Sequence, residues 1–326
     1  MANSPLKVLG IVASATIGVA SAAYGAQKVI VNSLSKNEVD FEFRAAKSQI
    51  LTTTDGTKIQ IFIDGPKIPD VEKPTVLFIH GYVLSSAIWS YQFELLREEY
   101  NVIAFDIRGH GSSSVGSNDI NLESYADDIH EVINELDLKN LVIVGHSTGG
   151  VVALSYLKNY EEEVKERIVG LCLTSTLAEP PYHSLKNVSE AMSRFSFAGR
   201  TFQALSDVPI LGYPLARFAM GKKASSAVIE FVRRSIASTD AEVSNQVLRM
   251  LLNFSFIDEL KNFTGKSCVI VGSSDPVTPL SDALFIAETL GGEVDIIHDV
   301  GHVPMLESPE EFNDILLGFL HKFTEE

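Results

Sequence analysis

The sequence predicts an α/β fold: a mostly parallel sheet with helices on both faces and an inserted helical segment. Three observations predict it. Short apolar runs alternate with helical segments, a hairpin signal precedes them, and about ninety residues interrupt the alternation after the fourth run. Strands that alternate with helices form parallel sheets with right-handed crossovers. The 326 residues, 45% of them hydrophobic, suffice to bury one large core of this kind.

The hairpin signal is Asp55-Gly56, which separates strand-like segments at 48–53 and 58–63 and predicts an antiparallel pair. The apolar runs that follow have the length and β-branched content of strands buried on both faces. They lie at 75–79, 102–105, 141–144, 168–173, 268–271 and 294–297. Helical spacing occurs between them, at 85–98, 122–136, 148–160, 280–290 and 309–323.

The interruption between residues 173 and 267 is helical in character and far longer than a strand-to-helix connection requires. We interpret residues 181–255 as a helical cap (lid) inserted over the strand ends, where open α/β sheets bind their ligands. Nine Lys/Arg and five Asp/Glu give this segment a net charge of +4, although the whole chain carries -16. The core of the fold is then expected at 37–180 and 256–326.

The first 36 residues form a separate segment. Residues 8–27, from Val8 to Gln27, carry no charge and are bracketed by Lys7 and Lys28. Twenty such residues match the length of a membrane-spanning helix, although small residues weaken the apolar character. An uncleaved anchor, a cleaved signal peptide and a helix packed on the core all remain open. We therefore expect a membrane-anchored or a secreted protein.

Composition excludes several classes of partner. The acidic balance, without a basic run, argues against a nucleic-acid partner. Cys172 and Cys268 lie in apolar runs and are interpreted as buried hydrophobic residues, with a disulfide between neighbouring strands as the alternative. The eight histidines are scattered without a metal-binding pattern, and no G-x-G-x-x-G follows the early strands. We expect no metal or redox cofactor and no nucleotide.

The strongest motif is GHSTG at 145–149, which stands between an apolar run and a helical segment. A strand that turns sharply into a helix holds its turning residue in a strained conformation above the sheet, and that residue is Ser147. The glycines at 145 and 149 allow the backbones to pass. The amide of Thr148, at the helix N-terminus, points to where an oxyanion would form.

A serine hydroxyl becomes a good nucleophile only with a base and an orienting carboxylate. After such a strand–turn–helix serine, the acid and then the base follow in the chain. Asp275 follows the run at 268–271, and His302 follows the run at 294–297. Because carboxyl ends of parallel strands meet at one edge, the three residues can converge. Asp299 and Glu179 are competing acids in less suitable loops.

The segment His80-Gly81-Tyr82 follows the run at 75–79. A backbone amide from such a loop commonly supplies the second oxyanion donor, so Tyr82 is the candidate. His80, Gly81, Trp89 and His146 are candidates for binding substrate. For His80 we favour shaping the loop over catalysis, and Trp89 is expected in the core or in the pocket wall.

Five segments, in this order, resemble the α/β-hydrolase superfamily: HGYVLSSAIW, DIRGHGSSS, GHSTGG, GSSDPVTP and GHVPMLESPEEF. Within it the chain is similar to cofactor-free serine hydrolases, the bacterial esterases and non-haem haloperoxidases, and especially to actinobacterial hydrolases with an N-terminal apolar segment. The resemblance implies Ser147 as nucleophile and Asp275 and His302 as acid and base, with oxyanion amides at Tyr82 and Thr148. Serine at position 147 argues against the dehalogenase and epoxide hydrolase branches, which carry aspartate at this strand-to-helix turn.

The expected activity is hydrolysis of a small-molecule carboxylic ester through an acyl-enzyme on Ser147, as in carboxylesterases or lipase-like enzymes. Acyl transfer, perhydrolysis and carbon–carbon bond hydrolysis use the same triad and stay open. So does a catalytically silent binding protein of this fold. The basic, Phe-bearing cap and the apolar N-terminus further suggest an acyl or lipid-like ester. The sequence does not indicate the oligomeric state.

Overall fold

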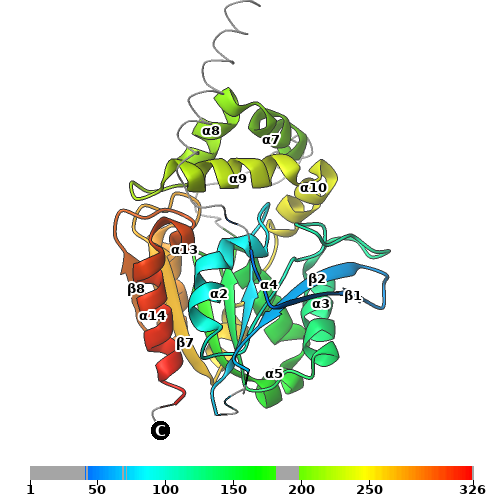
Figure 1. Ribbon diagram of the computed structural model, residues 1–326, viewed down its shortest axis with the longest axis vertical. Coiled ribbons are helices and arrows are strands. Elements are labelled where there is room, and N and C mark those ends of the chain that lie inside the picture. Colours follow the sequence, from blue (N-terminus) through cyan, green and yellow to red (C-terminus); the bar gives the residue numbers. More distant parts are fainter. Residues whose placement is uncertain (1–40, 42, 68–69, 71, 181–197, 325–326) are drawn as a thin grey trace, which may run out of the picture.

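A computed structural model describes residues 41, 43–67, 70, 72–180 and 198–324 of the chain. These residues form one eight-stranded sheet with the order β1-β2-β4-β3-β5-β6-β7-β8, covered by helices on both faces (Figure 1). The strands are β1 Lys47–Thr52, β2 Lys58–Asp64, β3 Thr75–Ile79, β4 Val102–Phe105, β5 Leu141–His146, β6 Ile168–Thr174, β7 Lys266–Gly272 and β8 Val294–Ile297. The predicted α/β architecture, a mostly parallel sheet with helices on both faces, is confirmed.

The sheet opens with the antiparallel pair that the hairpin signal predicts. Gly56 lies in the turn between β1 and β2 with φ of 85°, a conformation that glycine adopts without strain. β2 pairs antiparallel with β4, and every later pairing, from β4 to β8, is parallel. The carboxyl ends of β3 and β5 to β8 therefore lie along one edge of the sheet.

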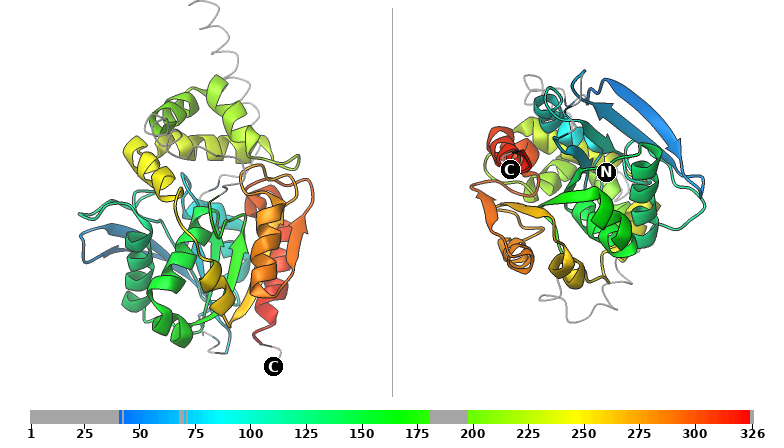
Figure 2. Two further views of the ribbon diagram at one scale, coloured as in Figure 1. Left: turned by 180° about the vertical axis from the view of Figure 1, so that it is seen from behind. Right: turned by 90° about the horizontal axis from the view of Figure 1, so that it is seen from below.

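Alternate strand residues face two different layers of helices. Leu77 and Ile143 pack into a core with α3 Leu122–Glu135, α4 Thr148–Asn159, α11 Ile257–Asn262 and α12 Leu280–Leu290. Val76 and Val142 face the opposite core, with a 3-10 turn at Ser86–Trp89, α2 Ser90–Leu96 and α14 Pro309–His321. Figure 2 shows α14 and α2 on the other side of the sheet from α4. Because successive side chains of a strand point to opposite faces and helices cover both faces, the strand runs are apolar throughout.

The long interval between β6 and β7 contains α7 Ala198–Asp207, α8 Pro209–Phe218, α9 Ser226–Ser238 and α10 Ala241–Met250. Figure 1 shows these helices beyond one end of the sheet, away from the C-terminus. They occupy the interval 181–255, of which 181–197 lie outside the described residues. That this segment acts as a cap, and the domain boundaries at 36, 180 and 255, stay predictions.

The structure adds three short helices that the sequence reading did not separate: α5 Glu161–Arg167, α11 Ile257–Asn262 and α13 Pro304–Glu307. None exceeds seven residues, so none completes enough turns to show a helical period. Cys172 and Cys268 are register partners on β6 and β7, and both thiols are free and buried. The interpretation as buried hydrophobic residues is confirmed.

The apolar stretch 8–27 lies outside the described residues. In the part of the chain that the structure describes, no helix has the length and apolar character needed to cross a membrane. Anchoring, secretion and localisation therefore stay predictions.

One buried ion-pair cluster ties the hairpin to α3. Arg108, which is 1% exposed, donates two hydrogen bonds to Asp128, of 2.7 and 2.6 Å, and one of 3.0 Å to Asp55. Burial by itself raises the pKa of the Asp55 carboxyl, but hydrogen bonds from Thr53 and Thr57 and the Arg108 charge outweigh burial and hold it well below its usual value. The segment after β4 thus braces its neighbours.

Replacing Arg108 with methionine should lower the free energy of unfolding by roughly 3 to 5 kcal/mol, because it leaves buried carboxylates without their partner. Urea denaturation measures the change. The matched control is Arg249→Met, since Arg249 pairs with Glu242 at the surface and its side chain is 44% exposed. Loss of that pair should cost at most about 1 kcal/mol. Equal effects of the two substitutions would contradict the structural role given to Arg108.

Candidate active site

Ser147 occupies a sharp turn between a buried strand and a helix. β5 ends at His146 and α4 begins at Thr148, so a single residue makes the reversal. Ser147 has φ of 51° and ψ of -122°, which is strained for a residue with a side chain. The side chain remains partly exposed, whereas its neighbours on both sides are buried. The turn thus presents the hydroxyl at the carboxyl edge of the sheet.

The glycines of the motif are required by close contacts. A Cβ atom on Gly149 would lie 2.3 Å from the carbonyl oxygen of Ile79, and one on Gly145 would lie 2.8 Å from the Cα of Gly150. Real Cβ atoms do not approach backbone atoms so closely. The close passage predicted for positions 145 and 149 is therefore confirmed, and it places the start of α4 directly against the end of β3.

Asp275, His302 and Ser147 form one continuous hydrogen-bonded chain. His302 Nε2 lies 3.0 Å from Ser147 Oγ, and His302 Nδ1 lies 2.9 Å from Asp275 Oδ2. Asp275 follows β7 and His302 follows β8, so parallel neighbours deliver both residues to the same edge. Nδ1 donates to the carboxylate, which leaves Nε2 free to accept the serine proton. The convergence that the sequence predicted is present.

The Asp275 carboxylate is fixed by several donors. Its Oδ1 accepts hydrogen bonds from the amides of Val277, at 2.8 Å, and Thr278, at 3.0 Å, and its Oδ2 accepts one from the Thr278 hydroxyl at 2.6 Å. Burial opposes its charge, but the charge and hydrogen bond of His302, together with Thr278, hold its pKa below the usual 3.8. Its contribution to folding stability is fully present above the unfolded pKa and is lost as the pH falls through the lower folded value.

Neither competing acid joins this chain. Asp299 is 55% exposed at its side chain and pairs with Lys222 at 3.1 Å. Among the described residues, no hydrogen bond or ion pair links Asp299 or Glu179 to His302. Asp275 is therefore the carboxylate in position to orient the imidazole.

Of the two predicted oxyanion donors, Thr148 directly follows Ser147 and Tyr82 lies in the loop after β3. Within the described residues, neither the Tyr82 amide nor the Thr148 amide has a hydrogen-bond acceptor. A Cβ atom on Gly81 would lie 3.0 Å from the Cβ of Ser147, so the loop after β3 passes directly beside the serine. The Tyr82 hydroxyl hydrogen-bonds to Ser244 of α10, which ties this loop to the inserted helices. Both amides are available for an oxyanion, and that role stays a prediction.

Three of the four substrate-binding candidates are fully buried. Trp89 packs in the core against Phe78. His80 Nδ1 donates to the carbonyl of Gly81 and its Nε2 accepts from the amide of Ile107, so the ring links the loop after β3 to the segment after β4. His146 donates from Nε2 to the His302 carbonyl at 2.7 Å. The prediction of substrate contact at these three side chains is corrected, because each has no exposed surface. Gly81 remains a candidate through its backbone.

The buried histidines are neutral. Burial lowers the pKa of His80 to about 4 and that of His146 to about 3. His146 Nδ1 has no hydrogen-bond partner among the described residues, whereas His302 Nε2 lies 3.0 Å from Ser147 Oγ, so His302 is the histidine in position to act as the base.

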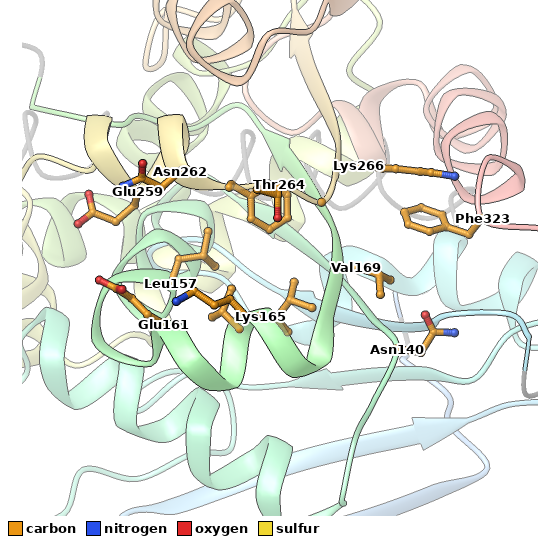
Figure 3. A pocket seen from close by; sticks show the side chains of 14 residues that line it. Asn140, Leu157, Glu161, Lys165, Val169, Glu259, Asn262, Thr264, Lys266 and Phe323 are labelled. Atoms are coloured by element: carbon orange, nitrogen blue, oxygen red, sulfur yellow. The ribbon is translucent and has the colours of Figure 1, made fainter.

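A cleft of about 520 Å³ lies at the opposite edge of the sheet, near the amino ends of β6 and β7 (Figure 3). Its lining includes Leu157, Lys165, Phe263 and Phe323. None of the triad residues lines it. No group of three or more His, Cys, Asp or Glu side chains in the described chain could hold a metal ion.

The chain is similar to several known proteins over most of its length. A model of the Alpha/beta hydrolase family matches residues 76–315. 3-Oxoadipate enol-lactonase 1 of Acinetobacter baylyi is 24% identical over 84% of this chain and 97% of its own. A non-heme chloroperoxidase of Burkholderia pyrrocinia is 28% identical over 83% and 98% of the two chains. Among solved structures, a thermophilic esterase from Thermogutta terrifontis is 27% identical with a TM-score of 0.70, covering 85% of this chain and 99% of its own.

Proposed function

Because the chain belongs to the alpha/beta hydrolase family, we propose that it hydrolyses a small-molecule carboxylic ester through an acyl-enzyme on Ser147. The observation that carries the proposal is the hydrogen-bonded chain from Asp275 through His302 to Ser147, with distances of 2.9 and 3.0 Å. Enol-lactonase and esterase relatives support the same reaction class, since both names denote cleavage of an ester bond.

The geometry supports the following sequence of steps. His302 Nε2 takes the Ser147 proton while Oγ attacks the ester carbonyl, and Asp275 stabilises the imidazolium. The amides of Tyr82 and Thr148 would bind the tetrahedral oxyanion. The imidazolium then protonates the departing alcohol and leaves the acyl group on Ser147. His302 next takes a proton from water, whose oxygen attacks the acyl carbon, and the imidazolium returns that proton to Ser147 Oγ as the second tetrahedral intermediate collapses and releases the acid.

The test combines a substrate with a covalent probe. The wild-type protein should hydrolyse p-nitrophenyl acetate or butyrate, and a fluorophosphonate probe should label Ser147, as located by mass spectrometry of the peptides. A folded protein that neither hydrolyses the esters nor reacts with the probe would fit a silent binding protein instead. Offering hydrogen peroxide or an alcohol in competition with water would show whether perhydrolysis or acyl transfer is preferred.

We further propose an acyl or lipid-like ester as substrate, with attachment to a membrane through residues 8–27. The segment 181–255 carries +4 on a chain of -16. In that segment, Leu205, Leu211 and Phe218 are 38%, 50% and 71% exposed. An exposed apolar surface beside cationic residues favours contact with lipid.

The rate of hydrolysis should therefore rise with acyl chain length. We expect kcat/KM for p-nitrophenyl octanoate to exceed that for the acetate by roughly tenfold, given about 0.8 kcal/mol per buried methylene and incomplete burial of the chain. The measurement is a series from two to twelve carbons at submicellar concentration. A sharp preference for acetate would remove the lipid proposal and leave ester hydrolysis intact.

A further inference from the structure

The backbone of His302 is held by two different parts of the fold. Its amide donates to the carbonyl of Ala219, just after α8, at 2.8 Å. Its own carbonyl accepts the hydrogen bond from His146 of β5, at 2.7 Å. The peptide groups on both sides of the proposed base are thus fixed by elements distant in the chain.

A buried carboxylate completes this arrangement. Glu307 of α13 is 6% exposed. Its Oε2 accepts from the amide of Gly301 at 3.0 Å and its Oε1 from that of Val303 at 3.2 Å, the residues on either side of His302. The same Oε2 accepts from the amide of Gly221 at 2.7 Å. One carboxylate therefore binds both flanks of the base and the segment after α8.

The segments that Glu307 joins are in direct backbone contact. A Cβ atom on Gly221 would lie 2.3 Å from the carbonyl oxygen of Asp299, and one on Gly301 would lie 2.4 Å from the Gly221 amide nitrogen. The Lys223 amide also donates to the Asp299 carbonyl at 3.2 Å. No side chain fits between these two backbone segments. The distance between them is therefore set by their direct contacts and by the carboxylate that binds both.

We propose that Glu307 is a positioning residue that holds the backbone around His302 and links it to residues 219–223, keeping Nε2 within reach of Ser147 Oγ. This inference rests on the proposed function, because it assigns to His302 the role of base. Three buried amides converge on one carboxylate, and a charged acceptor binds them more strongly than a neutral one. Glu307 contacts neither Ser147 nor Asp275 by hydrogen bond, so it acts through the backbone alone.

The decisive substitution is Glu307→Gln, which keeps the shape but replaces one acceptor oxygen with an NH₂ group that faces a donor. We expect kcat for p-nitrophenyl butyrate to fall at least about tenfold with KM changed less than about twofold, because small displacements of a base cost mainly the chemical step. The rate of fluorophosphonate labelling at Ser147 should fall by a similar factor. Circular dichroism and the melting temperature establish that the assayed protein is folded.

The matched control is Glu311→Gln. Glu311 also binds the segment after α8, through Lys223 Nζ at 2.7 Å, but at the surface and without touching the flanks of His302. Its replacement should leave kcat within about twofold of wild type, since surface ion pairs contribute little. Equal losses in E307Q and E311Q would overturn the inference, because they would trace the effect to general loosening of this region.

A second variant decides the case if E307Q does not fold. Gly221→Ala leaves the carboxylate in place but forces the segment after α8 away from the His302 loop. A folded G221A with lowered kcat and unchanged KM supports the inference, and wild-type kcat in either folded variant overturns it. Failure of the wild-type protein to hydrolyse esters or to react with the probe would reject the proposed function itself, which is a different result from a defect confined to the variants.

Discussion

Replacing Ser147 with alanine should lower kcat for p-nitrophenyl butyrate by about 10⁵-fold or more while leaving the fold intact. The substitution removes the only hydroxyl within hydrogen-bond distance of His302 Nε2 among the described residues, at 3.0 Å. Loss of the nucleophile in a serine triad removes nearly all covalent catalysis. The backbone conformation at φ of 51° is as accessible to alanine as to serine, so folding should not suffer.

Stopped assays at high enzyme concentration, with melting temperature as the check on folding, measure this effect. The matched control is Ser85→Ala. Ser85 lies in the loop after β3, where its side chain makes no capping hydrogen bond. That variant should keep the wild-type rate within about twofold. If S147A retained wild-type turnover, the assignment of the nucleophile would be wrong.

Replacing Asp275 with asparagine should lower kcat by about ten-thousandfold. The Asp275 carboxylate accepts from His302 Nδ1 at 2.9 Å and from the Thr278 hydroxyl at 2.6 Å through the same oxygen. An asparagine NH₂ group in that place would turn a donor toward Nδ1 and favour the tautomer with its proton on Nε2. That tautomer cannot take the serine proton.

Asp299→Asn provides the comparison that separates the two acids considered from the sequence. Asp299 lies in the same loop as His302 but is exposed and pairs with Lys222. It has φ of 61°, which asparagine tolerates as readily as aspartate. We expect the kcat of the Asp299→Asn variant to lie within about threefold of the wild-type value. A larger loss in D299N than in D275N would exchange the roles of the two carboxylates.

The three residues of the hydrogen-bonded chain could be predicted from the sequence because each stands where a strand ends. Ser147, Asp275 and His302 follow three buried apolar runs, and a parallel sheet brings such positions to one edge whatever their separation in the chain. Tyr82 and Thr148 were predictable in the same way, because Tyr82 lies in the loop after β3 and Thr148 directly follows the serine. Both were inferred from backbone position, and a strand-to-helix turn fixes backbone position closely.

Side-chain environments were harder to predict. Tryptophan and histidine occur both in pocket walls and in cores. Only the packing shows that Trp89, His80 and His146 are buried. Glu307 was missed because it precedes an acidic helix start, where a glutamate commonly faces solvent. The signal that could have found it is its position five residues after His302, at the end of a one-turn helix that begins at Pro304. The Tyr82–Ser244 contact joins residues 162 positions apart and carries no local signal.

The two free thiols offer a way to observe the sheet itself. Cys172 and Cys268 lie side by side on adjacent strands, at 0% and 6% exposure, and the chain has no other cysteine. Both side chains pack in the core on the α14 side of the sheet, so an alkylating reagent can reach them only when that core opens, and the rate of alkylation measures this opening under native conditions. A cysteine introduced at the surface would meanwhile accept a fluorescent dye without competition from the native pair. The protein is thus suited to kinetic labelling without removing either natural cysteine.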